Sequence, residues 1–269
     1  MSTSNFLARP EGRLAYDLDG DGPLIVCLPG MGDLRTTYRF LVPALVDAGY
    51  RVATLDLRGH GDSDATFSSY DDEALASDAI ALIEELGGPA YVVGNSMGAG
   101  AAVIVAGTRP DLVDGLVLLG AFVRDPQVSR VTAVLNRVLM WPPWARRMWK
   151  AYLPKLYAGT KPTDFDAHRD RMIEAMKAPG KARAFSLTVK TSHAPAEARL
   201  PQVKAPALIV MGALDPDFPD PKAEAEWIAE SLGGDVLIVD EVGHYPQSQA
   251  PGIVNLAVIG FLRKPGTDA

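Results

Sequence analysis

Short apolar runs alternate along the chain with longer amphipathic stretches. The runs are rich in β-branched residues and predict buried strands over residues 24–28, 51–55, 90–93, 116–119, 207–211 and 236–239. Apolar positions at helical spacing predict helices over residues 35–48, 71–86, 99–108, 221–232 and 253–262. This alternation predicts an α/β fold with a mostly parallel central sheet and helices on both faces. Ligands bind such sheets at the carboxyl ends of the strands.

The alternation stops between Phe122 and Pro206, where prolines and aromatic residues are frequent. This stretch predicts a helical cap at residues 122–200, inserted between two parts of the core at residues 1–121 and 201–269. Ordinary helices packed on the sheet are the alternative. Trp141, Trp144 and Trp149 lie here and are candidates for binding an apolar substrate. Aromatic side chains that form the cap's own core would explain them equally well.

Composition narrows the class of protein. The chain has 269 residues and a formal net charge of −7, which argues against a nucleic-acid partner because phosphates require a basic face. The single cysteine, Cys27, lies in a buried run and allows no internal disulfide. The N-terminal residues have no apolar core of a signal peptide, and no run is long enough to span a bilayer. These features predict a cytoplasmic protein; they do not indicate an oligomeric state.

Gly94-Asn95-Ser96-Met97-Gly98 matches the pattern G-x-S-x-G. A buried strand precedes it and a helix rich in small residues follows it, which is the setting of a nucleophile elbow. Such a turn lifts the Ser96 hydroxyl above the sheet and puts the backbone N–H of Met97 at a helix N-terminus. Because a serine hydroxyl is a poor nucleophile alone, a base must accompany it.

Four histidines could supply that base. His244 follows the last predicted strand, and its loop opens at the same edge of the sheet as Ser96. His60 lies at a strand end upstream of the serine, and His168 and His193 fall in the predicted cap. We therefore predict that His244 is the base and that the other three are surface or structural residues.

The acid that orients the histidine is expected between the serine and the histidine in the chain. Asp215 is the first acidic residue after the strand at residues 207–211. Asp217 and Asp220 are close enough to compete, although aspartates in proline-rich loops commonly form turns. The strand at residues 116–119 has no carboxylate after it until Asp125, so an acid at that position is not expected.

The order Ser96, Asp215, His244 resembles that of the α/β-hydrolase superfamily. The segments LPGMG (28–32), DLRGHGDSD (56–64) and GNSMGAG (94–100) resemble its oxyanion loop, a further signature and its elbow. They are similar to the capped branch of carboxylesterases, haloperoxidase-like esterases and hydrolases of meta-cleavage products. The resemblance implies an α/β-hydrolase fold and an oxyanion hole formed by the backbone N–H groups of Met31 and Met97. Pro29 departs from the pattern, because members often have histidine there.

The resemblance implies acyl transfer in two steps, without a metal or organic cofactor. A serine nucleophile indicates a carbonyl substrate, whereas haloalkane dehalogenases and epoxide hydrolases of this fold use aspartate. The histidines show no H-x-H-x-D or H-E-x-x-H spacing of a metallohydrolase. The expected partner is a small molecule, an apolar ester or lactone. A carbon–carbon bond hydrolase is the alternative, and a non-catalytic small-molecule receptor of the same fold is a remote one.

Overall fold

The computed structural model describes residues 4–126 and 138–263. Its centre is a sheet of eight strands in the order β1-β2-β4-β3-β5-β6-β7-β8. The strands are β1 Asn5–Arg9, β2 Gly12–Asp19, β3 Leu24–Leu28, β4 Arg51–Leu55, β5 Ala90–Asn95, β6 Val113–Leu119, β7 Ala207–Gly212 and β8 Asp235–Val239. β2 pairs antiparallel with β1 and β4, and all other pairs are parallel. The predicted α/β-hydrolase fold, with a mostly parallel sheet, is confirmed.

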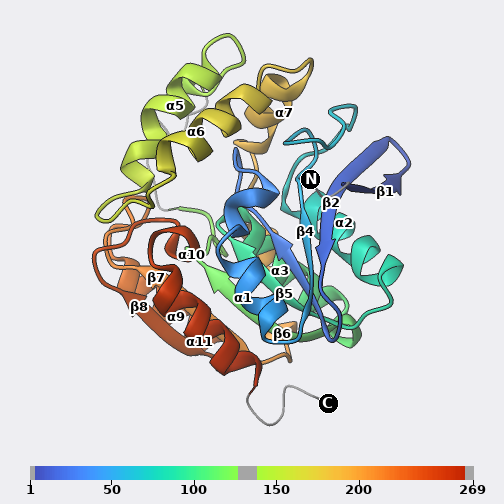
Figure 1. Cartoon of the computed structure of the whole chain (residues 1–269), viewed down its shortest axis with the longest axis vertical. Helices are drawn as coiled ribbons and strands as arrows, with labels where there is room; N and C mark the ends of the chain where they lie inside the picture. The colour runs from blue at the N-terminus through green and yellow to red at the C-terminus, as the bar shows by residue number, and fades with distance from the viewer. Residues whose placement is uncertain (1–3, 127–137, 264–269) are drawn as a thin grey trace.

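Helices cover both faces of this sheet (Figure 1). They are α1 Leu41–Asp47, α2 Asp72–Glu85, α3 Met97–Thr108, α5 Ala145–Leu156, α6 Phe165–Ala175, α7 Lys181–Thr188, α8 Ala194–Arg199, α9 Pro221–Leu232, α10 Pro246–Gln249 and α11 Pro251–Leu262, with 3-10 turns η1 Arg35–Tyr38, η2 Pro110–Leu112 and η3 Leu200–Gln202. Helices α2, α3 and α9 share one apolar core with the sheet, and α1 and α11 share the other.

Strand β3 shows why a continuous apolar run suits this position. All five of its residues are buried. Leu24, Val26 and Leu28 belong to one core and Ile25 and Cys27 to the other, because successive side chains of a strand point to opposite faces. Cys27 is a free, buried thiol, as its place in the run predicts, and burial raises its pKa.

One local prediction was wrong, and one hairpin was not predicted. The hairpin β1–β2 was not expected at all. The helix predicted over residues 35–48 is instead the short turn η1 followed by α1. Pro43 explains the break, because it lacks the N–H that a helix beginning at Arg35 would need at that point. In α1 it falls in the first turn, where no intrahelical partner is required.

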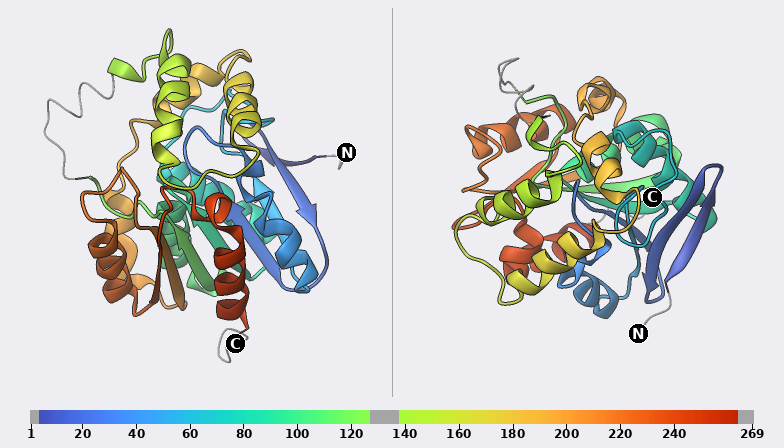
Figure 2. Two further views of the ribbon diagram at one scale, coloured as in Figure 1. Left: turned by 60° about the vertical axis from the view of Figure 1, so that its left-hand side comes forward. Right: turned by 90° about the horizontal axis from the view of Figure 1, so that it is seen from above.

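Helices α5, α6 and α7 lie together beyond the carboxyl ends of the strands (Figure 1), and the views in Figure 2 agree. They share a third apolar core, which includes Trp149, Leu153, Phe165 and Phe185. By contrast, α8 packs its Ala196 into the core formed with α3. The domain division at residues 121 and 200 stays a prediction, and its residues 127–137 lie outside the described part of the chain.

Candidate active site

Ser96 lies in the sharp turn between β5 and α3. Its φ of 57° and ψ of −123° lie in a region that non-glycine residues rarely adopt. The flanking glycines permit the turn: a Cβ on Gly94 would lie 2.3 Å from the Gly98 carbonyl oxygen, and one on Gly98 would lie 2.1 Å from the Leu28 carbonyl oxygen. This geometry is that of a nucleophile elbow.

The loop after β3 lies directly against this elbow. A Cβ on Gly30 would lie 2.8 Å from the Cβ of Ser96. The backbone of the loop therefore lies in direct contact with the side chain of Ser96. Met31 follows in that loop, and Met97 is the first residue of α3, where a backbone N–H has no acceptor within the helix. The two residues predicted to form the oxyanion hole therefore lie in the two segments that meet at Ser96. Their role as donors stays a prediction.

The loop that carries Met31 is held by a histidine that we predicted to be structural. The backbone N–H of Gly32 donates to His60 Nε2 at 3.0 Å, and His60 Nδ1 lies 2.9 Å from the Arg58 carbonyl oxygen. Because a carbonyl only accepts, Nδ1 carries the proton and the ring is neutral. Burial lowers the pKa of His60 to about 4, which favours the same neutral form. Trp149 Nε1 donates to the Gly32 carbonyl oxygen at 3.1 Å, so Gly32 is fixed from both sides.

Replacing His60 with leucine is expected to lower both stability and turnover. The Gly32 N–H would be left buried without an acceptor, which costs about 1–3 kcal/mol. Looser placement of the loop is expected to lower kcat roughly tenfold, the scale seen when supporting groups of a site are removed. Thermal melting and steady-state kinetics would measure both effects. His60→Gln, whose amide oxygen can accept the same bond, should recover part of each loss; a leucine variant with unchanged kcat would refute the positioning role.

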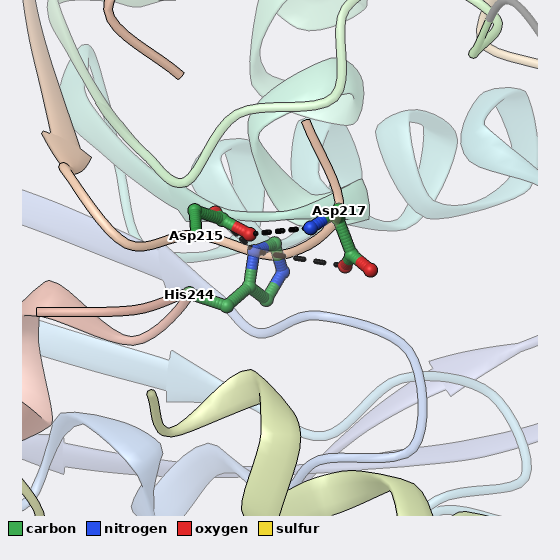
Figure 3. A group of neighbouring side chains, drawn as sticks. All are labelled: Asp215, Asp217 and His244. Atoms are coloured by element: carbon green, nitrogen blue, oxygen red, sulfur yellow. Dashed lines mark hydrogen bonds and ion pairs between the residues drawn. The ribbon is translucent and has the colours of Figure 1, made fainter. Parts of the chain in front are cut away.

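His244 and Asp215 come together as the sequence predicts (Figure 3). His244 Nδ1 lies 2.7 Å from Asp215 Oδ2, and both side chains are buried. The backbone N–H of Asp217 donates to Asp215 Oδ1 at 3.1 Å and so fixes the second carboxylate oxygen. Asp217 Oδ2 lies farther from His244 Nδ1, at 3.9 Å. The Asp215 carboxylate therefore selects the tautomer that leaves His244 Nε2 free to accept a proton.

Backbone contacts hold His244 from two directions. Asn95, which precedes Ser96, donates from Nδ2 to the carbonyl oxygens of Leu119 and His244, at 3.0 and 3.2 Å. From the other side, the His244 N–H donates to the carbonyl oxygen of Leu156 at the end of α5, at 2.8 Å. Sequence reasoning missed Asn95, although its place inside the G-x-S-x-G pattern was a signal. Within the described residues no hydrogen bond joins the Ser96 hydroxyl to His244, a contact that in enzymes often tightens only with substrate.

The carboxylates of Asp215, Asp217 and Asp33 act on the charge state of His244. Burial lowers the pKa of the imidazole, but the charge and hydrogen bond of Asp215 and the charge of Asp217 outweigh burial and raise that pKa to about 9. Burial raises the pKa of Asp217, whose Oδ1 accepts a hydrogen bond from the Tyr152 hydroxyl at 2.5 Å. Because a general base must be neutral to accept a proton, this raised pKa predicts that a reaction with His244 as base is faster at alkaline pH than at neutral pH.

The value of kcat/KM is therefore expected to rise about tenfold per pH unit up to about pH 9 and to level off above it. Removing one nearby negative charge with Asp217→Asn is expected to lower the pKa of His244 and move this limb to lower pH. Initial rates with a p-nitrophenyl ester, corrected for hydrolysis without enzyme, would measure the profile. Asp220→Asn, which retains a good N-cap residue for α9, is the matched control. If kcat/KM rises over the same pH range in the wild type and in Asp217→Asn, Asp217 does not raise the pKa of His244 and the prediction is wrong.

Asp215, Asp217 and His244 also form the one group, within residues 4–126 and 138–263, whose ligand atoms lie close enough together to hold a metal ion. Their atoms lie within 4.8 Å of one another. The 2.7 Å contact between His244 Nδ1 and Asp215 Oδ2 is a hydrogen bond of normal charge-assisted length. The hydrogen bond from His244 to Asp215 therefore explains why these three side chains lie close together.

The remaining candidates occupy other positions. His168 Nε2 pairs with Asp33 Oδ1 at 3.0 Å and His193 Nδ1 with Asp72 Oδ2 at 2.7 Å, so both are buried structural residues. Asp220 caps α9, and Asp125 accepts bonds from Ser192 and the His193 N–H.

The three tryptophans do not gather at the site. Trp149 is buried in the third core, whereas Trp141 and Trp144 are 58% and 39% exposed. Phe122 instead lies beside His244, with the centroids of the two rings 5.8 Å apart. Substrate binding by the tryptophans stays a prediction.

The class of protein follows from this fold and this arrangement. Residues 25–256 match the model of the alpha/beta hydrolase family, and the chain belongs to that family.

Relatives within the family differ in activity. The chain is 27% identical over 267 residues to the AB hydrolase superfamily protein YfhM of Bacillus subtilis, covering 90% of this chain and 91% of that protein. It is 29% identical to a 2-hydroxy-6-oxononadienedioate/2-hydroxy-6-oxononatrienedioate hydrolase of Burkholderia vietnamiensis, covering 94% and 92%. The solved structure of the esterase EaEST from Exiguobacterium antarcticum superposes with a TM-score of 0.83 at 20% identity, covering 97% of this chain and all of that one. At that identity the likeness shows the shared fold.

Proposed function

We propose that this hydrolase cleaves a carboxylic ester or lactone through an acyl-enzyme, with Ser96 as nucleophile, His244 as general base and Asp215 as the acid that orients it. The observation that carries the proposal is the hydrogen bond between His244 Nδ1 and Asp215 Oδ2, formed beside a serine in a strained elbow. His244 takes the proton of Ser96 as the hydroxyl attacks the carbonyl carbon. The N–H groups of Met31 and Met97 stabilise the oxyanion, the alcohol leaves with the proton, and water then hydrolyses the acyl-enzyme.

A carbon–carbon bond hydrolase is the second candidate. The relative from Burkholderia vietnamiensis, a 2-hydroxy-6-oxononadienedioate/2-hydroxy-6-oxononatrienedioate hydrolase, covers 94% of this chain and motivates this candidate. Both reactions use a carbonyl electrophile and the same serine elbow. They differ in the leaving group, since carbon–carbon cleavage must protonate a carbanion instead of an alkoxide.

Three substrate classes distinguish these candidates: p-nitrophenyl esters of increasing acyl length, small lactones, and a vinylogous diketone of the meta-cleavage type. Labelling with a fluorophosphonate is run alongside. Turnover of esters or lactones with labelling is the expected result. Labelling with turnover of the diketone alone would replace the ester proposal with the second candidate. If the protein is not labelled and turns over none of these substrates, a small-molecule receptor is the better description.

A further inference from the structure

One end of the cap differs from the rest of the chain in charge and in composition. Residues 138–163 contain five lysines and arginines and no aspartate or glutamate, although the whole chain carries a formal net charge of −7. The same segment contains three of the four tryptophans. It leads into and includes α5, which Figures 1 and 2 show at the outer side of the cap.

The apolar side chains that open this segment face outward. Val138, Trp141 and Trp144 are 46%, 58% and 39% exposed. The two indole rings pack edge to face with centroids 6.1 Å apart, and Trp144 Nε1 donates to the Val138 carbonyl oxygen at 2.7 Å. The two indole rings thus contact each other, and the Val138 carbonyl oxygen holds Trp144, so three exposed apolar residues lie together at this end of the segment.

Exposed cationic side chains lie next to this cluster on α5. Helical spacing puts Arg147 and Lys155 on the same side of α5 as Trp144, and both are exposed. The opposite side, with Trp149 and Leu153, is buried in the cap. Lys150 pairs with Asp170 at 3.0 Å, but no ion pair within the described ranges involves Arg147 or Lys155. We call Val138, Trp141, Trp144, Arg147 and Lys155 the basic tryptophan face.

We infer that the basic tryptophan face docks on an anionic lipid surface. Indole rings favour the boundary between headgroups and acyl chains, because their apolar rings and polar N–H suit both sides of it. Lysine and arginine beside them are attracted to anionic headgroups. None of the described helices is long and apolar enough to cross a membrane.

Nucleic acid is the less suitable partner for this face. Single strands stack their bases on open aromatic rings, whereas Trp141 and Trp144 pack on each other and lie beside the aliphatic Val138. The inference does not depend on the proposed ester or lactone activity.

Co-sedimentation of the full chain with phosphatidylcholine vesicles, with and without phosphatidylglycerol, tests the inference. The protein should bind only the anionic vesicles and should be released by high salt, which screens exposed charges. The variant Arg147→Gln with Lys155→Gln should bind roughly fivefold more weakly for each cation removed. Trp141→Ala with Trp144→Ala should weaken binding by at least as much.

Matched controls keep the test specific. Leu256→Ala removes an apolar side chain that is 75% exposed on α11, and Lys222→Gln removes a cation whose side chain is 69% exposed on α9; both should bind like wild type. Unchanged melting temperatures would show that the face variants still fold. Absence of vesicle binding by wild type, or equal binding by face and control variants, would overturn the inference. So would preferential binding of a short RNA oligonucleotide, or a dimer in solution that the tryptophan variant abolishes.

Discussion

Ser96→Ala is expected to lower kcat for any accepted ester by roughly 10⁴- to 10⁶-fold, the range seen when the nucleophile of a Ser-His-Asp site is removed. The alanine side chain offers no oxygen for the acyl-enzyme, whereas the elbow itself should persist because the flanking glycines allow its backbone. Fluorophosphonate labelling should disappear with turnover. Gel fluorescence after labelling and initial rates with the best p-nitrophenyl ester would measure the two losses.

Ser231→Ala is a suitable control for this loss. Ser231 lies exposed on α9 and donates to the Trp227 carbonyl oxygen, so its removal should change neither rate nor labelling. Ester turnover that survives in Ser96→Ala would show that another group is the nucleophile. The assignment of His244 and Asp215 would then lose its basis as well.

Asp215→Asn is expected to lower kcat by roughly 10⁴-fold, the scale of the corresponding change in a serine protease. An amide would offer its N–H₂ or its oxygen to His244 Nδ1 without a negative charge. The tautomer with a free Nε2 would no longer be favoured, and the imidazolium formed during attack would lose its partner. Rates at a pH where the wild-type profile is flat would give the chemical effect apart from the shift in pKa.

The neighbouring Asp217→Asn gives the decisive comparison. Its carboxylate lies 3.9 Å from His244 Nδ1, against 2.7 Å for Asp215, and its backbone N–H would remain to support Asp215. We therefore expect only a few-fold change in kcat at the plateau, because a partner beyond hydrogen-bond distance adds charge but no orientation. A larger loss in Asp217→Asn than in Asp215→Asn would reverse the two roles.

The parallel strands could be predicted from the sequence to within three residues at each end. A strand buried on both faces must be apolar throughout, and turn residues such as Pro29 and Gly30 bound its run sharply. The antiparallel hairpin was missed because β1 is largely exposed, while β2 mixes polar and apolar residues. Leu14 and Tyr16 point inward with period two, but their burial depends on pairing with β4, which local sequence does not encode.

The order of the residues in the chain and their positions after strands were enough to predict that Asp215 and His244 lie together. They did not predict the hydrogen bonds that hold the backbone around these residues. The bond from Gly32 to His60 joins loops after two different strands, and the bond from Asn95 to His244 spans 149 positions. The tryptophans show the same limit, since composition placed them in one segment but could not distinguish the buried Trp149 from the exposed Trp141.

The attachment of His244 to the end of α5 has a consequence for engineering this scaffold. Besides the bond to Leu156, the Thr160 N–H donates to the Glu241 carbonyl oxygen, and Gly159 forms a bridge with Val242. Residues 156–160 thus belong structurally to the loop that carries His244, although in sequence they lie between the cap helices α5 and α6. A chimera that exchanges the cap for that of another member should therefore leave residues 156–160 in place and exchange only the segments before and after them. A graft that replaces part of residues 156–160 would remove the hydrogen bonds that hold the loop of His244. The resulting loss of activity could then be misread as a change of substrate specificity.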